Sequence, residues 1–146
     1  MNGAALNREH NASEAFTALF RRFEHALKLG DFLAKKQRAE ADWRAFAESL
    51  GVEFFVGVRQ SKKAPTLIQE PPRRLMADLT WKPDVPIPIE NVVELFQRGV
   101  CQVRNNLFHG EKYIGSREAQ SRDEALVSES LWVLRLASEK APKLKL

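Results

Sequence analysis

The sequence predicts an all-α fold, a helical bundle of four to five helices with a long irregular connection before its third long helix. Two observations lead to this prediction. Apolar residues recur at the spacing of one helix face in four separate segments. Six prolines lie together in residues 59–89, between the second and third of those segments, and they exclude a long helix there.

The first two helices are predicted from their apolar faces and from the residues that would end them. The first carries apolar side chains at Phe16, Leu19, Phe20, Phe23 and Leu27. We expect Ser13 to cap its start and Gly30 to end it. The second should run from Arg38 to Leu50, with a stripe at Ala39, Trp43, Phe46, Ala47 and Leu50. The next run, VEFFVGV, is expected to form a short helical turn.

Two further helices are predicted after the proline-rich connection. Regular structure should resume near Glu90 and reach His109, with Gly110 as the stop. The stripe that predicts this helix is Ile89, Val92, Val93, Phe96, Val100, Val103 and Leu107. The last helix should begin at a capping box of Ser121 and Glu124 and continue to Ala137.

Length and composition set the class of protein that we expect. A chain of 146 residues can bury a core as a single domain, residues 1–146, and residues 1–12 and 139–146 are expected to fray. The single cysteine, Cys101, excludes an internal disulfide and is expected to be a packed thiol. Because we find no leader peptide and no apolar run of about 20 residues, we expect a cytoplasmic protein without a membrane segment.

Charge adds little to these expectations. A formal net charge of +4 is compatible with a polyanionic partner, yet many proteins without a nucleic-acid role are equally basic. The clusters RQSKK and PPRR make residues 59–89 the most basic internal segment, and a solvated loop is the ordinary interpretation of such a segment.

The segment RNNLFHGEK, residues 104–112, has two interpretations. In the first it is the polar end of a helix, with Gly110 as terminator and His109 favourably placed near the helix dipole. In the second it is a catalytic site. Arg104 suits a phosphate, Asn105 can orient the histidine or bind a phosphate oxygen, and His109 can transfer protons near neutral pH. Such a set fits metal-independent cleavage of RNA, whose 2′-hydroxyl supplies an internal nucleophile.

A helical wheel places these residues relative to the core. At about 100° per residue, Arg104 lies on the rim of the apolar stripe, whereas Asn105 and His109 point together from nearly the opposite side. Phe108 is then exposed on a second, semi-buried face. A helix with such a face favours a dimer.

The motif Arg104-Asn105-x-x-x-His109, near the end of the third long helix of an all-α chain, resembles that of the HEPN superfamily. The stretches FRRFEHALK, EPPRRLMADLTW and ENVVELFQRGVCQVRNNLFHGEK look like a bacterial subgroup found among plasmid, phage and defence proteins. The resemblance implies a homodimer in which Arg104 and His109 of both copies line one cleft. Many such proteins are endoribonucleases that act as toxins or antiphage effectors, whereas others bind nucleotides or are non-catalytic partners.

The resemblance leads to a set of expected site residues and partners. Arg104, Asn105 and His109 would be catalytic, and Asn106, Lys112 and Glu24 would contact the RNA substrate. Glu24 could instead pair with Arg104, and an ordinary surface charge or a pair with Lys28 is the competing interpretation. Arg73 and Arg74 are weaker candidates for backbone contacts. We expect no metal and no cofactor, and an antitoxin or a nucleotidyltransferase as a further partner. The alternative function is a non-catalytic module that binds a nucleotide, RNA or a protein.

Overall fold

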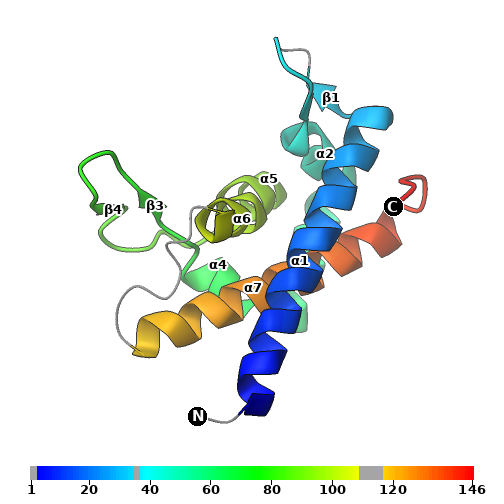
Figure 1. Cartoon of the computed structure of the whole chain (residues 1–146). Helices are drawn as coiled ribbons and strands as arrows, with labels where there is room; N and C mark the ends of the chain where they lie inside the picture. Colours follow the sequence, from blue (N-terminus) through cyan, green and yellow to red (C-terminus); the bar gives the residue numbers. More distant parts are fainter. Residues whose placement is uncertain (1–2, 35–36, 109–116) are drawn as a thin grey trace.

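Helices make up most of the fold, and two short antiparallel hairpins project from them (Figure 1). The computed structural model describes the backbone of residues 3–34, 37–108 and 117–146, and the side chains within these ranges except residues 3–10 and 117–120. The predicted all-α class is therefore confirmed at the level of a mainly helical chain. No helix in the described ranges is long and apolar enough to cross a membrane.

The two longest helices are α1, Gly3–Leu29, and α7, Arg117–Lys140, which pack across each other (Figure 1). The predicted apolar face of α1 is confirmed, because it buries Phe16, Phe20, Phe23 and Leu27. Both predicted starts are wrong, since Ser13 and Ser121 lie inside their helices. Good helix formers such as Ala, Arg and Glu precede each serine, and they extend the helix beyond the predicted cap.

Helix α2, Trp43–Leu50, begins later than predicted. Residues 38–42 were expected to be helical, but β2, Glu40–Ala41, pairs with β1, Leu33–Ala34, in an antiparallel hairpin. Asp42 then caps α2, because its side chain accepts a hydrogen bond from the Ala45 amide at 3.0 Å. Strand pairing and this cap together set the start of the helix.

Gly51 joins α2 to α3, Val52–Ser61, at a φ of 81°, which favours glycine. The helix α3 is a full element rather than the short turn expected from VEFFVGV, and it buries Phe54, Phe55 and Val58. After it come the short helix α4, Pro65–Gln69, and the hairpin of β3, Arg74–Leu75, and β4, Trp81–Lys82. The absence of a long helix over residues 59–89 is confirmed, although α3 extends into this range as far as Ser61 and the connection holds more regular structure than predicted.

The predicted third long helix is present as one continuous helical segment, residues 92–108, which we call the central helix. It consists of α5, Val92–Glu94, a π-helical segment η1, Leu95–Val100, and α6, Cys101–Phe108. Asn91 caps its start by accepting a hydrogen bond from the Glu94 amide at 2.9 Å. The π-helical segment was not predicted, and a wheel drawn at a constant 100° per residue does not hold across it.

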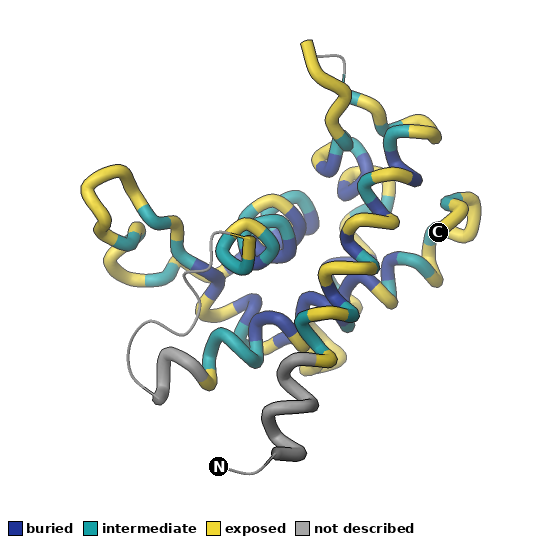
Figure 2. Tube along the Cα trace, viewed as in Figure 1, coloured by how far each residue is buried: buried dark blue, intermediate teal, exposed yellow. Residues whose placement is uncertain are grey.

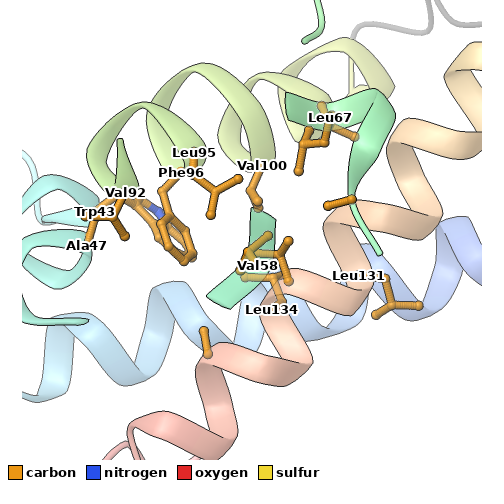
Figure 3. Packing of buried hydrophobic residues seen from close by; sticks show 14 of the residues in the cluster. Trp43, Ala47, Val58, Leu67, Val92, Leu95, Phe96, Val100, Leu131 and Leu134 are labelled. Carbon is orange, nitrogen blue, oxygen red and sulfur yellow. The ribbon is translucent and has the colours of Figure 1, made fainter. Parts of the chain in front are cut away.

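The hydrophobic core is arranged around the central helix. Phe96 contacts the rings of Trp43, Phe46 and Phe54 at centroid distances of 5.9, 5.8 and 6.0 Å. Figure 3 shows Phe96 and Trp43 within this packing. Figure 2 shows the buried residues on the facing sides of the helices, whereas the β3–β4 hairpin is mostly exposed.

Gly99 allows a close approach on the α4 side of the central helix. A Cβ at this position would lie 3.2 Å from Ile89 Cδ1 and 3.3 Å from Leu67 Cδ1. Ile89 is itself held to α4 by a hydrogen bond from its amide to the Ile68 carbonyl at 2.8 Å. The glycine therefore brings the π-helical segment, α4 and Ile89 together.

Glu129 of α7 fixes α4 against the bundle. Its Oε1 accepts hydrogen bonds from the amides of Thr66 at 2.8 Å and Leu67 at 3.2 Å. These amides belong to the first turn of α4, where a helix has no internal acceptors for them. The carboxylate therefore completes the start of a helix that is too short to be stable alone.

We expect substitutions of Glu129 to separate its acceptor role from its charge. Glu129→Ala should lower the free energy of unfolding by about 1–3 kcal/mol, because two amides lose their acceptor. Glu129→Gln keeps an acceptor oxygen and should cost less. Burial raises the pKa of this carboxyl above its ordinary value, although the bonds from Leu67 and Thr66 act in the opposite direction.

The raised pKa fixes the sign of the pH dependence. A carboxyl whose pKa is raised by folding stabilises the fold most below its unfolded pKa, and this contribution is lost as the pH rises through the folded value. As the pH rises above the ordinary carboxyl pKa of 4.5, the difference in free energy of unfolding between Glu129→Gln and the wild type should therefore shift in favour of the Gln variant, measured by urea unfolding. A shift in favour of the wild type over this range would contradict the assignment.

Ser130 offers a second test of the core. Its hydroxyl is fully buried and has no hydrogen-bond partner among the described residues. Ser130→Ala should raise the free energy of unfolding by about 1 kcal/mol more than Ser128→Ala, because the exposed Ser128 reports only the helix-propensity gain. Equal effects in thermal or urea unfolding would show that the Ser130 hydroxyl is satisfied in solution.

Candidate functional site

Arg104 lies near the C-terminal end of α6, where its guanidinium is held between two aromatic rings. Its Cζ lies 5.6 Å from the ring centroid of Phe20, a buried residue of α1, and 4.8 Å from that of Phe108. Both distances are within the range of cation–π attraction. These contacts with ring faces help to hold the group and do not use its N–H donors in conventional hydrogen bonds.

Asn105 lies beside Arg104 and is exposed. Its Oδ1 is 3.4 Å from Arg104 Nη1, at the long end of hydrogen bonding. The structure therefore brings together two of the three residues expected to be catalytic. The third, His109, lies outside the described residues, and so does Lys112.

Asn106 is half-buried, and both ends of its amide are engaged. Its Oδ1 accepts a hydrogen bond from Gln102 Nε2 at 2.9 Å, and its Nδ2 donates to the Arg73 carbonyl at 3.0 Å. The side chain thus ties α6 to the segment that precedes β3. Contact with a substrate, as expected from the sequence, would have to use the second N–H or the second lone pair of this half-buried amide.

Glu24 and Arg104 both act on the thiol of Cys101. Burial raises the pKa of this thiol from its ordinary 9.0 to about 12, the nearby Glu24 carboxylate raises it further, and Arg104 acts in the opposite direction. Glu24 is therefore within electrostatic range of the Cys101 thiol on α6. The expectation of a packed thiol at Cys101 is confirmed.

Arg73 and Arg74 lie at the start of the β3–β4 hairpin. Arg73 is half-buried, and its backbone carbonyl binds Asn106. Arg74 is exposed on β3 and faces a groove on another side of the central helix.

Sequence reasoning missed two residues that shape this site. Phe20 was assigned only to the core, although its ring also supports Arg104. Gln102 was not singled out, although its spacing of four from Asn106 was a readable signal for a side-chain hydrogen bond on one helix face.

No group of three His, Cys, Asp or Glu side chains that could hold a metal ion occurs among the described residues. What the arrangement offers chemically is a positioned guanidinium, an exposed amide beside it, and a histidine four residues after that amide in the sequence.

Comparisons of this chain with protein-family models, with curated proteins and with solved structures found no match.

The reactivity of Cys101 tests the positions of Glu24 and Arg104. Because only the thiolate reacts, a pKa near 12 in place of 9.0 lowers the reactive fraction about a thousandfold. Iodoacetamide at pH 8 should therefore alkylate the folded chain about a thousandfold more slowly than the chain in urea.

Two substitutions should then shift the alkylation rate of the folded chain in opposite directions. Glu24→Gln removes a charge that raises the pKa and should speed alkylation, whereas Arg104→Gln should slow it further. Glu53→Gln, at an exposed position of α3, is the matched control. If Glu24→Gln behaves like the control, the Glu24 carboxylate does not face Cys101 in solution.

Proposed function

We propose that this protein is a metal-independent endoribonuclease of the HEPN type. The observation that supports the proposal is the Arg104 guanidinium, which lies at cation–π distance from Phe20 and Phe108 and beside the exposed Asn105. A planar guanidinium fixed in this way can bind a phosphodiester with little further ordering. The spacing from Arg104 through Asn105 to His109 adds the proton-transfer group that such a reaction needs.

The proposed reaction is an attack of the substrate's own 2′-hydroxyl on the adjacent phosphorus. His109 removes the hydroxyl proton as general base while the 2′-oxygen bonds to phosphorus. Arg104 stabilises the negative charge that develops on the phosphoryl oxygens. The bond to the 5′-oxygen breaks, and this oxygen takes a proton from the second subunit's His109 or from water. The products are a 2′,3′-cyclic phosphate and a 5′-hydroxyl.

The proposal includes a homodimer with a shared cleft. Phe108 is 75 % exposed although it stacks on Arg104, and a second copy that covers this ring would remove apolar surface from water. In a two-fold dimer each copy would present the same residues to the other, which supplies the second histidine. A role as a toxin or antiphage effector, restrained by an antitoxin or a nucleotidyltransferase, would be consistent with such an activity.

The second candidate function is a non-catalytic module that binds a nucleotide, RNA or a protein. A basic groove beside the central helix favours it, because that groove supplies a binding surface apart from Arg104. Binding without cleavage is the behaviour that would distinguish this candidate.

Cleavage of a labelled single-stranded RNA in EDTA tests the proposal. His109→Ala should lower the cleavage rate by about 10²–10⁴-fold, because a general base is removed. Arg104→Ala should lower it by about 10²–10³-fold. Arg104→Lys should recover little activity, because lysine keeps the charge but lacks the planar fork and its stacking.

Matched controls are available on other helices. His25→Ala on α1 and Arg44→Ala on α2 remove the same side-chain types at exposed positions and should leave cleavage unchanged. Thermal unfolding of every variant excludes loss of structure as the cause. Undiminished cleavage by His109→Ala would show that the activity arises elsewhere, and RNA binding without any cleavage would favour the non-catalytic module.

A further inference from the structure

A groove of about 530 Å³ opens between the β3–β4 hairpin and the central helix. In Figure 1 the hairpin lies on one side of the central helix and α1 on the other, so the groove and the Phe20 contact of Arg104 lie on different sides of that helix. The volume is within the range of sites for small ligands. The groove is therefore large enough to be a binding site distinct from the Arg104 contact.

The charged side chains that line the groove are all basic: Arg74, Lys82 and Arg98. Arg98 also has a structural role, because its Nη1 lies 3.1 Å from Glu94 Oε1 and its Nη2 donates to the Ile87 carbonyl. It braces the segment that returns from the hairpin to the helix. Arg74 and Lys82 are the two cations left to meet a ligand.

These two cations lie directly opposite each other. In the antiparallel pairing of β3 and β4, Arg74 is the register partner of Lys82. Like charges in this arrangement destabilise a hairpin, and their Cβ atoms are typically about 5 Å apart. An anion bound between the two cations would attract both of them and offset their mutual repulsion. Lys82 also forms an ion pair with Asp84, with 3.0 Å between Nζ and Oδ1, but this pair is exposed and such pairs contribute little to stability.

The tip of the hairpin is held in place locally. The Asp78 carboxylate accepts hydrogen bonds from the Thr80 hydroxyl at 2.6 Å and the Thr80 amide at 3.0 Å, and these bonds lower the pKa of Asp78. The Met76 amide also donates to the Thr80 carbonyl at 2.8 Å. The hairpin can therefore present Arg74 and Lys82 in a fixed arrangement.

The opposite wall of the groove comes from the π-helical segment and the start of α6. It carries Gln97, Arg98 and Gln102, and apolar side chains such as Ile87 and Pro83 border it. Segments of π-helix occur frequently at functional sites. The side-chain amides of Gln97 and Gln102 can hydrogen-bond the edges of a nucleobase whose face packs on the proline and aliphatic side chains, and the two cations can bind its phosphate.

We propose that this groove binds one nucleotide, with its phosphate between Arg74 and Lys82 and its base along the apolar wall within reach of Gln97 and Gln102. The nucleotide is either a free mononucleotide or one unit of an RNA strand. In the second case the inference rests on the proposed function, because the groove would hold the substrate beside the bond that is cut.

The geometry of α6 makes the RNA source feasible. At 100° per residue, the exposed Asn105 lies between Gln102 at the groove and Arg104 at the candidate site. A helix with its side chains is only about 10–12 Å across, so a short strand could reach both sides. Gln102 also bonds to Asn106, which links this wall of the groove to the end of α6.

Binding measured in the full chain carrying His109→Ala tests the groove without cleavage. The probes are a fluorescein-labelled single-stranded oligoribonucleotide, followed by anisotropy, and AMP, followed by calorimetry. Adding Arg74→Ala and Lys82→Ala should weaken binding about tenfold or more and reduce the salt dependence of RNA binding by about 0.7 in log–log slope. Arg44→Ala with Lys63→Ala is the matched control, since it removes the same charges at exposed positions outside the groove lining.

Gln97→Glu is a second, independent variant that places a negative charge in the groove and leaves the hairpin intact. It should weaken binding to a similar degree, and it keeps the test decisive if the double substitution disturbs folding. If the groove variants lose both RNA and AMP binding, the groove is a free-nucleotide site. If they lose RNA binding alone, and AMP is bound weakly by all variants, the groove is an RNA subsite. Affinities equal to those of the matched control would overturn the proposal.

The two proposals fail separately. If binding depends on Arg74 and Lys82 but the protein never cleaves RNA, the proposed groove is supported and the proposed endoribonuclease activity is contradicted. If cleavage requires His109 but the groove variants do not change RNA binding, the endoribonuclease activity is supported and the groove proposal is contradicted.

Discussion

A continuous series of stacked rings connects the core to the candidate site, and the position of Arg104 depends on it. Phe96 packs on Trp43 at 5.9 Å, Trp43 stacks on Phe20 at 4.9 Å, and Phe20 lies 5.6 Å from the Arg104 guanidinium. Phe96 and Arg104 both belong to the central helix, whereas Trp43 and Phe20 belong to α2 and α1. The same packing that buries the central helix therefore also orients the guanidinium at its end.

This arrangement has a consequence for electrostatics. A buried or half-buried arginine usually needs a carboxylate, and the pair then has little tendency to bind an anion. Here aromatic faces supply part of the stabilisation, and they do so without neutralising the charge. The β3–β4 hairpin differs, because Arg74 and Lys82 are exposed on a two-stranded ribbon. Their like charges lie opposite each other and lower the stability of the hairpin. Features that oppose local stability are expected at functional sites.

Much of the helical fold could be predicted from apolar periodicity, because burying one face imposes a 3.6-residue repeat that is visible in the sequence. Phe16, Phe20 and Phe23 were predicted to face the core and do so. Helix starts were less predictable, since a serine caps a helix only when the residues before it are not helical. The residues before Ser13 and Ser121 are helical, so neither serine is a cap. The strand at Glu40–Ala41 depends on pairing with residues 33–34, which local pattern does not encode.

The candidate site was predictable as a set of residues but not as an arrangement. Arg104 and Asn105 could be identified from their spacing to His109. The contact of Arg104 with Phe20 joins residues 84 positions apart and depends on how α1 crosses the central helix. The π-helical segment likewise changes the rotation of everything after it, and no residue type in Leu95–Val100 signals it. The groove arises from a hairpin folded back on that segment, which is a tertiary feature.

The central claim is that the substrate's own 2′-hydroxyl is the nucleophile at a site formed by Arg104 and His109. The most direct measurement is cleavage of an RNA in which the nucleotide on the 5′ side of a mapped cut is replaced by its 2′-deoxy form. The account predicts that the wild-type protein no longer cuts at that bond, while it still binds the substrate and cuts elsewhere. Continued cleavage at the 2′-deoxy position would contradict it, because the attacking oxygen would then have to come from water or from the protein.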